Sequence, residues 1–157
     1  MKLFAQVDQD ILKAAFIERI TRFVEWPSGY FSDTSTVIVV GIMNNKAYAE
    51  KIKAIFSNQK IKNRIVKVLP LKEGEDISLC QICYFDNISQ ENIMLAGVQA
   101  NKHGILLFSH GVNITETGVH FNFYTGKNNL KFEINERSVK SSGFKISHLL
   151  MKSARIL

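Results

Sequence analysis

The stretch TVIVVGI, residues 36–42, is continuously apolar and rich in β-branched side chains. An unbroken apolar run of this kind is typical of a strand buried on both faces, as in a parallel sheet that helices cover on either side. Asn44 or Asn45 follows as a helix N-cap, and residues 48–56 then carry apolar side chains at helical spacing. A buried strand that leads directly into an amphipathic helix indicates an α/β fold.

The same alternation continues along the chain. RIVKVLPL (64–71), LCQICYFD (79–86) and GILLFS (104–109) have strand character, and Ser89 opens a helix between the last two. Strands that alternate with helices pair in parallel through crossover connections. We therefore expect a mostly parallel, doubly wound sheet with helices on both faces.

The pattern changes after residue 117. GVHFNFYT (118–125) and NLKFEIN (129–135) flank a turn that contains GKNN (126–129), which predicts an antiparallel C-terminal hairpin at one edge of the sheet. Strict alternation in the first strand places Val119, Phe121 and Phe123 on one face, and His120, Asn122 and Tyr124 on the other. Two short helices should follow, and Gly143 is placed to end the first of them.

The N-terminal segment predicts a helix from the N-cap Asp8 to Trp26. Pro27 stops it, because proline has no backbone N–H and its ring clashes with the preceding turn. Trp26 is the only tryptophan in the chain. At a helix edge it is either a core plug or an exposed anchor for a partner, and the burial tendency of aromatic side chains favours the plug.

The two ends of the chain carry a family resemblance. KAAFIERITRFVEWP (13–27) and FEINERSVKSSGFKISHLLMKSARIL (132–157) resemble the YfiR-like family of bacterial periplasmic proteins. Members of that family open with an Ala-Ala-Phe helix that runs into Glu-Trp-Pro. They close with Phe-Glu-Ile-Asn, a glycine-containing turn and a Ser-x-x-Leu-Leu-x-x-Ala helix. The resemblance covers residues 10 to 157, and we expect one domain over 7–157 after a leader remnant or added start at 1–6.

The resemblance implies a regulator without catalysis or cofactor. YfiR-like proteins act from the periplasm on a membrane-bound partner, which is typically a diguanylate cyclase that makes cyclic di-GMP or else a sensor kinase. The expected function is therefore repression of such a partner. A small-molecule-sensing extracytoplasmic domain is the alternative, and an enzyme on a flavodoxin-like scaffold is a more distant one.

A partner-binding surface needs an aromatic or apolar anchor framed by charges. Both family motifs supply such residues, at the edge of the first helix and in the closing motif. The predicted partner-binding residues are Arg22, Glu25, Trp26, Glu133, Arg137 and Phe144.

A ligand crevice follows from topology alone. Open α/β sheets bind ligands beyond the carboxyl ends of their parallel strands. The polar residues that fall there are Asn44, Asn45, Asp86, Asn87, Ser109 and His110. They suit a small ligand that forms hydrogen bonds, although the same residues serve equally as helix caps and loop residues.

Cys80 and Cys83 spell a CxxC inside the expected strand 79–86. Residues three apart on a strand face opposite sides and lie roughly 10 Å apart, too far for a disulfide. We expect two buried free thiols; a redox pair on a distorted turn, metal binding or an intermolecular bond are the alternatives. The two disulfides found in some YfiR-like proteins cannot form with two cysteines.

Other kinds of function find little support. Ser109 and His110 are adjacent on a strand end and cannot act together as nucleophile and base, and the four histidines lack the spacing of metal ligands. The net charge of +6 comes from scattered basic residues without a nucleic-acid motif. No apolar run approaches the ~18 to 20 residues that span a bilayer, so we expect a soluble protein without membrane insertion. The apolar residues of the last nine positions predict a homodimer.

Overall fold

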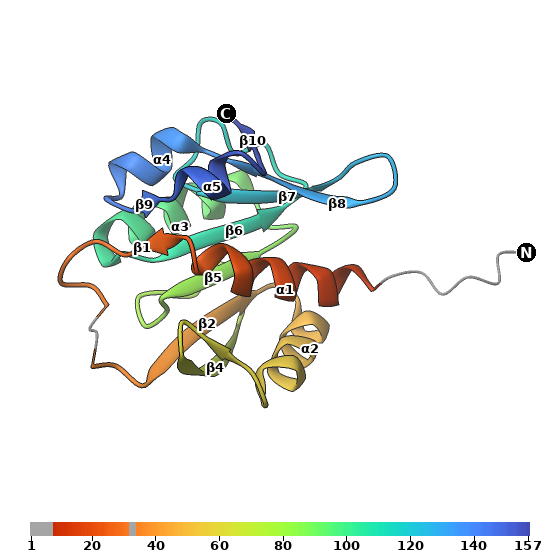
Figure 1. Cartoon of the computed structure of the whole chain (residues 1–157), viewed down its shortest axis with the longest axis vertical. Helices are drawn as coiled ribbons and strands as arrows, with labels where there is room; N and C mark the ends of the chain where they lie inside the picture. The colour runs from red at the N-terminus through yellow and green to blue at the C-terminus, as the bar shows by residue number, and fades with distance from the viewer. Residues whose placement is uncertain (1–7, 32–33) are drawn as a thin grey trace, which may run out of the picture.

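The computed structural model describes residues 8–31 and 34–157; the predicted leader remnant at 1–6 lies outside them. Within these residues the main sheet has eight strands in the order β10-β8-β7-β6-β5-β2-β4-β3 (Figure 1). Its strands are β2 (Val37–Met43), β3 (Lys60–Ile61), β4 (Arg64–Leu71), β5 (Ile82–Phe85), β6 (Leu106–His110), β7 (Phe121–Thr125), β8 (Leu130–Ile134) and β10 (Arg155–Ile156). The helices are α1 (Gln9–Thr21), α2 (Lys46–Phe56), α3 (Gln90–His103), α4 (Glu136–Ser141) and α5 (His148–Met151). A second, two-stranded sheet pairs β1 (Val24–Glu25) with β9 (Lys145–Ile146).

Parallel pairing dominates the main sheet, as the alternation of strands and helices predicts. β4, β2, β5, β6 and β7 form consecutive parallel pairs. The C-terminal hairpin β7–β8 is antiparallel, which is also as predicted. It lies one position in from the edge, because the short β10 pairs in parallel with β8 outside it. The fold class predicted from sequence is therefore confirmed, with β10 as an added edge strand.

An apolar cluster covers each face of the sheet. α1 and α2 lie on one face (Figure 1). Ile17 of α1 and Ile52 of α2 belong to the same buried cluster as Phe108 of β6 and Phe121 of β7. α3 packs on the other face through Ile93 and its neighbours. Both faces are thus buried, which explains why the central strands β2, β5 and β6 read as nearly continuous apolar runs.

The alternation predicted for residues 119–124 holds only within β7. Phe121 and Phe123 lie in the cluster under α1, as expected. Val119 lies in the opposite cluster, under α3, so its predicted place beside Phe121 is wrong. The reason is that β7 begins only at Phe121, and the period-two rule applies only to residues in strand conformation.

The first helix begins as predicted but ends earlier. The Asp8 carboxylate accepts a hydrogen bond from the Asp10 N–H at 2.9 Å, which is the expected N-cap. The helix stops at Thr21 instead of Trp26, because residues 24–25 leave it to pair with β9. The Lys62 ammonium donates to the carbonyl oxygens of Thr21 and Val24, each at 3.1 Å. The first of these bonds satisfies a carbonyl that the end of the helix leaves open.

Both cysteines are free and buried, as predicted. Their predicted placement on opposite faces of one strand is wrong. β5 starts at Ile82, so Cys80 lies in the preceding turn, and both sulfurs face Gly41. A β-carbon on Gly41 would lie 2.7 Å from the Cys80 sulfur and 3.5 Å from the Cys83 sulfur. A turn residue does not obey strand alternation, so Cys80 and Cys83 can present their sulfurs to the same side.

Candidate functional site

The two family motifs meet in space. β1, at the end of the N-terminal motif, pairs antiparallel with β9 in the closing motif, with Val24 opposite Ile146 and Glu25 opposite Lys145. The Ser147 N–H also donates to the Phe23 carbonyl oxygen at 3.0 Å. Segments from opposite ends of the chain therefore form one surface, which we call the end-pairing surface (Arg22, Glu25, Trp26 and Lys145).

Trp26 is half-buried in an aromatic group behind this surface. Its ring centroid lies 5.2 Å from that of Phe31 and 5.5 Å from that of Phe144, the latter in an edge-to-face arrangement. The Lys62 ammonium lies 5.7 Å from the centroid of the indole. Among the described residues, the buried Trp26 indole N–H has no hydrogen-bond partner. These contacts favour the plug over the exposed anchor.

The six predicted partner-binding residues differ in exposure: three are exposed, Trp26 is half-buried and two are buried. Arg22, Glu25 and Arg137 are exposed, and Arg22 forms an ion pair with Glu18 on the same helix. Phe144 is buried beneath Trp26. Glu133 is also buried; it accepts hydrogen bonds from the Asn122 amide and the Arg155 guanidinium, each at 2.9 Å. Glu25, Trp26 and Phe144 therefore lie close together, whereas the Glu133 carboxylate is occupied by contacts within the protein.

The residues predicted to line a ligand crevice lie at the carboxyl ends of β2, β5 and β6. Its polar groups bond largely to one another. The Asn44 amide donates to the Asn87 carbonyl oxygen at 3.1 Å, and the Asn45 amide donates to the Asp86 carboxylate at 3.1 Å. The Ser109 hydroxyl donates to the side-chain oxygen of Asn122 inside the fold, at 2.8 Å. Binding of a ligand there stays a prediction.

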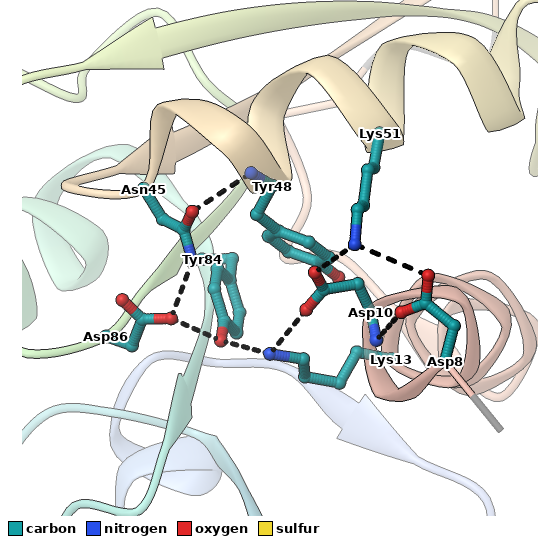
Figure 2. Close-up of polar contacts among 8 residues, drawn as sticks. All are labelled: Asp8, Asp10, Lys13, Asn45, Tyr48, Lys51, Tyr84 and Asp86. Atoms are coloured by element: carbon teal, nitrogen blue, oxygen red, sulfur yellow. Dashed lines mark hydrogen bonds and ion pairs between the residues drawn. The ribbon is translucent and has the colours of Figure 1, made fainter. Parts of the chain in front are cut away.

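A buried lysine joins this edge of the sheet to α1. The Lys13 ammonium donates to the Tyr84 hydroxyl at 2.9 Å, and that hydroxyl donates to the Asp86 carboxylate at 2.9 Å. Lys13 also pairs with Asp10 at 3.3 Å. Figure 2 shows this carboxyl-edge cluster (Asp10, Lys13, Asn45, Tyr84 and Asp86) as a continuous chain of contacts between α1, α2 and β5.

The Lys13 ammonium is surrounded by both polar groups and aromatic rings. Its ammonium lies 4.8 Å from the ring centroid of Tyr48 and 5.0 Å from that of Tyr84, within the range of cation–π attraction. Burial, followed by the Asp86 charge, raises the pKa of Tyr84, so the phenol stays protonated and can donate. Burial, and next the Lys13 charge, lowers the pKa of His110 nearby. The cluster therefore holds one buried cation between carboxylates and neutral tyrosines, which suits attachment of α1 to the sheet.

Lys13 was not among the predicted site residues. A signal was present in the sequence, because Lys13 shares a helical face with Ile17 and Ile20, and both isoleucines are buried. A lysine in line with core positions must reach a buried anion or a polar group. The identity of its partners, Tyr84 and Asp10, depended on the packing of α1 against the sheet.

Comparison with known proteins decides the family. The sequence pattern of the YfiR/HmsC-like family matches residues 10–155, nearly the whole chain. The chain belongs to the YfiR/HmsC-like family. This confirms the resemblance carried by the two end motifs. In the structure these motifs meet through the pairing of β1 with β9. The family is a regulatory, non-catalytic one.

Two other comparisons give no further information on the function of this YfiR/HmsC-like protein. No protein with a curated description matches it. Among solved structures, substrate-bound BacF from Bacillus subtilis is similar at a TM-score of 0.47 and 12% sequence identity. The similar region covers 85% of this chain and 47% of BacF, so the chain spans about half the length of that protein. Similarity at this level carries no argument about function.

One further observation bears on the membrane. Among the helices of the described residues, none combines the length and the apolar character required to cross a bilayer.

Proposed function

We propose that this YfiR/HmsC-like protein binds a membrane-bound diguanylate cyclase from the periplasmic side and represses it without catalysing a reaction. Cyclic di-GMP output would then fall when the protein is bound. We also propose that residues 7–157 act as one domain in this role. Family membership supports the class of partner.

The observation that carries the proposal is the pairing of β1 with β9. It brings the two family motifs, from opposite ends of the chain, together as the end-pairing surface, with the exposed Glu25 opposite Lys145. Trp26 lies half-buried beside them on Phe144. Charged residues around an aromatic centre are the usual composition of a binding surface.

A genetic experiment tests the proposal. Deletion of the gene should raise cellular cyclic di-GMP, and the rise should disappear when one particular membrane-bound diguanylate cyclase is also deleted. That second gene identifies the partner. An unchanged cyclic di-GMP level in the single deletion would contradict repression.

Complementation tests the surface. Glu25→Arg should fail to restore repression while its unfolding midpoint stays close to that of the wild type, because Glu25 is exposed. Lys67→Glu is the matched control: it also reverses one exposed charge, on β4, and should repress normally. Full repression by Glu25→Arg would place the partner on another surface.

A further inference from the structure

A groove runs between α1, the hairpin β7–β8 and the C-terminal segment α5–β10. Its volume is about 650 Å³, within the ~300–1,000 Å³ range of sites for small organic ligands. Its floor is apolar and includes Phe16, Ile20, Phe23, Phe132 and Leu150. Ile20 and Leu150 belong to the core, whereas Phe16 and Phe23 are only partly covered by protein. The groove thus offers unfilled apolar surface.

All the charged side chains that line this groove are positively charged. Arg19, Lys131, Lys152 and Arg155 line the groove, and no aspartate or glutamate does. Arg155 is compensated by an ion pair with the buried Glu133. In the part of the chain that the structure describes, Arg19, Lys131 and Lys152 form no ion pair. Three uncompensated positive charges beside an apolar floor attract an anion that also carries an apolar part.

The groove continues in one direction along α1. A second hollow shares Phe16 and Leu130 with it and reaches Leu12, Asn128 and Asn129. No lysine or arginine lines that second hollow. The positive end lies near α5. The end near the start of α1 is partly apolar, and its one charged lining residue is Asp8, which is negative and pairs with Lys51 at 3.3 Å. An elongated ligand would therefore bind with its charge at the α5 end.

We propose that this groove binds a single-chain anionic amphiphile of the fatty-acid class. The carboxylate lies among Arg19, Lys131 and Lys152, where guanidinium and ammonium groups donate charge-assisted hydrogen bonds to it. The alkyl chain lies on Phe16 and Ile20 and extends toward Leu12. The ligand would bind one face of α1, whose other contacts include the carboxyl-edge cluster. This inference is independent of the proposed repression of a cyclase.

The test uses dodecanoate below its micellar concentration as the probe, with isothermal titration calorimetry as the readout. We expect one dodecanoate per chain. Dodecyltrimethylammonium, which has the same chain and a positive head, should bind at least tenfold more weakly. The double variant Arg19→Glu/Lys152→Glu should bind dodecanoate at least tenfold more weakly than the wild type does. Lys67→Glu/Lys102→Glu changes the same charge at exposed positions outside the groove and should bind normally.

Several results would overturn the proposal. These are no binding of dodecanoate, equal binding of the two amphiphiles, or unchanged binding by a folded Arg19→Glu/Lys152→Glu variant. Binding to phosphatidylglycerol vesicles without binding of monomeric dodecanoate would assign the groove to a membrane surface instead. A dimer detected by light scattering that Leu149→Glu dissociates would assign it to a second copy, since Leu149 lines the groove and is exposed. None of these measurements depends on a cyclase, so their failure leaves the proposed function untouched.

Discussion

Lowering the pH from 7 to 5 should destabilise this protein, and His120 should be the main cause. The imidazole is fully buried. The Leu107 N–H donates to its Nδ1 at 3.0 Å, so the ring proton is on Nε2, which lies 3.0 Å from the Ser142 hydroxyl and donates to it. The Phe144 ring packs edge-to-face at 4.9 Å. Burial in this site lowers the pKa of His120 from 6.5 to about 3.

The direction of the effect follows from proton linkage. Below pH 6.5 the unfolded chain binds a proton at His120, whereas the native protein does not until the pH approaches 3. The stability contributed by the neutral imidazole is therefore present above pH 6.5 and is lost as the pH falls. Since one pKa unit corresponds to ~1.4 kcal/mol, the free energy of unfolding should fall by about 2 kcal/mol between pH 7 and pH 5.

Urea unfolding at pH 7, 6 and 5 measures the effect, with Trp26 fluorescence as the signal. His120→Gln should be less stable at pH 7, because it disrupts a buried polar site, but should lose at most about 0.5 kcal/mol between pH 7 and 5. His110→Gln is the control for the second histidine whose pKa burial lowers. The His110 ring is only half-buried, so this variant should keep most of the wild-type loss between pH 7 and 5. An equal loss in the wild type and in His120→Gln would refute the reasoning, as would a native His120 pKa near 6 measured by NMR.

Three further predictions concern packing. Trp26→Ala should cost about 3 kcal/mol of stability, measured by circular dichroism in urea, because it removes the ring that packs on Phe31 and Phe144. Leu79→Ala, at a 74% exposed position, is the control and should cost under ~0.5 kcal/mol of stability. A Trp26→Ala variant that melts like the wild type yet fails to repress would instead make Trp26 a partner anchor. Thiol titration without reductant should find about none of the cysteines reactive in the native protein and two after unfolding, since both are buried and burial raises the pKa of Cys80 to about 11. An intramolecular disulfide would contradict this. Gly97→Ala should lower the free energy of unfolding by ~1–3 kcal/mol although alanine favours helix, because the new β-carbon would lie 2.9 Å from the Gly118 Cα. Asn101→Ala, an exposed change on the same helix, is the control and should be neutral or stabilising. A Gly97→Ala variant more stable than Asn101→Ala would disprove the close packing.

Local signals predicted local structure well. The N-caps Asp8 and Ser89 and the stop at Gly143 lie where the sequence indicates, because a cap depends on residues two to four positions away. The failures share one cause. Periodicity assumes one regular backbone conformation along a segment. Helix α1 ends before Trp26 because residues 24–25 pair with the distant β9, and Cys80 lies outside β5 because a turn precedes that strand.

The sequence by itself determined the α/β class, the mostly parallel order of its central strands and the family, since hydrophobic period and short motifs are properties of neighbouring residues. The tertiary structure alone decided which distant residues meet. It paired β1 with β9 across the length of the chain, buried Lys13 against Tyr84, turned Glu133 inward and left a cationic groove beside α1. Such contacts depend on how whole faces of helices and sheets pack together, and that packing is set by the fit of all their side chains at once.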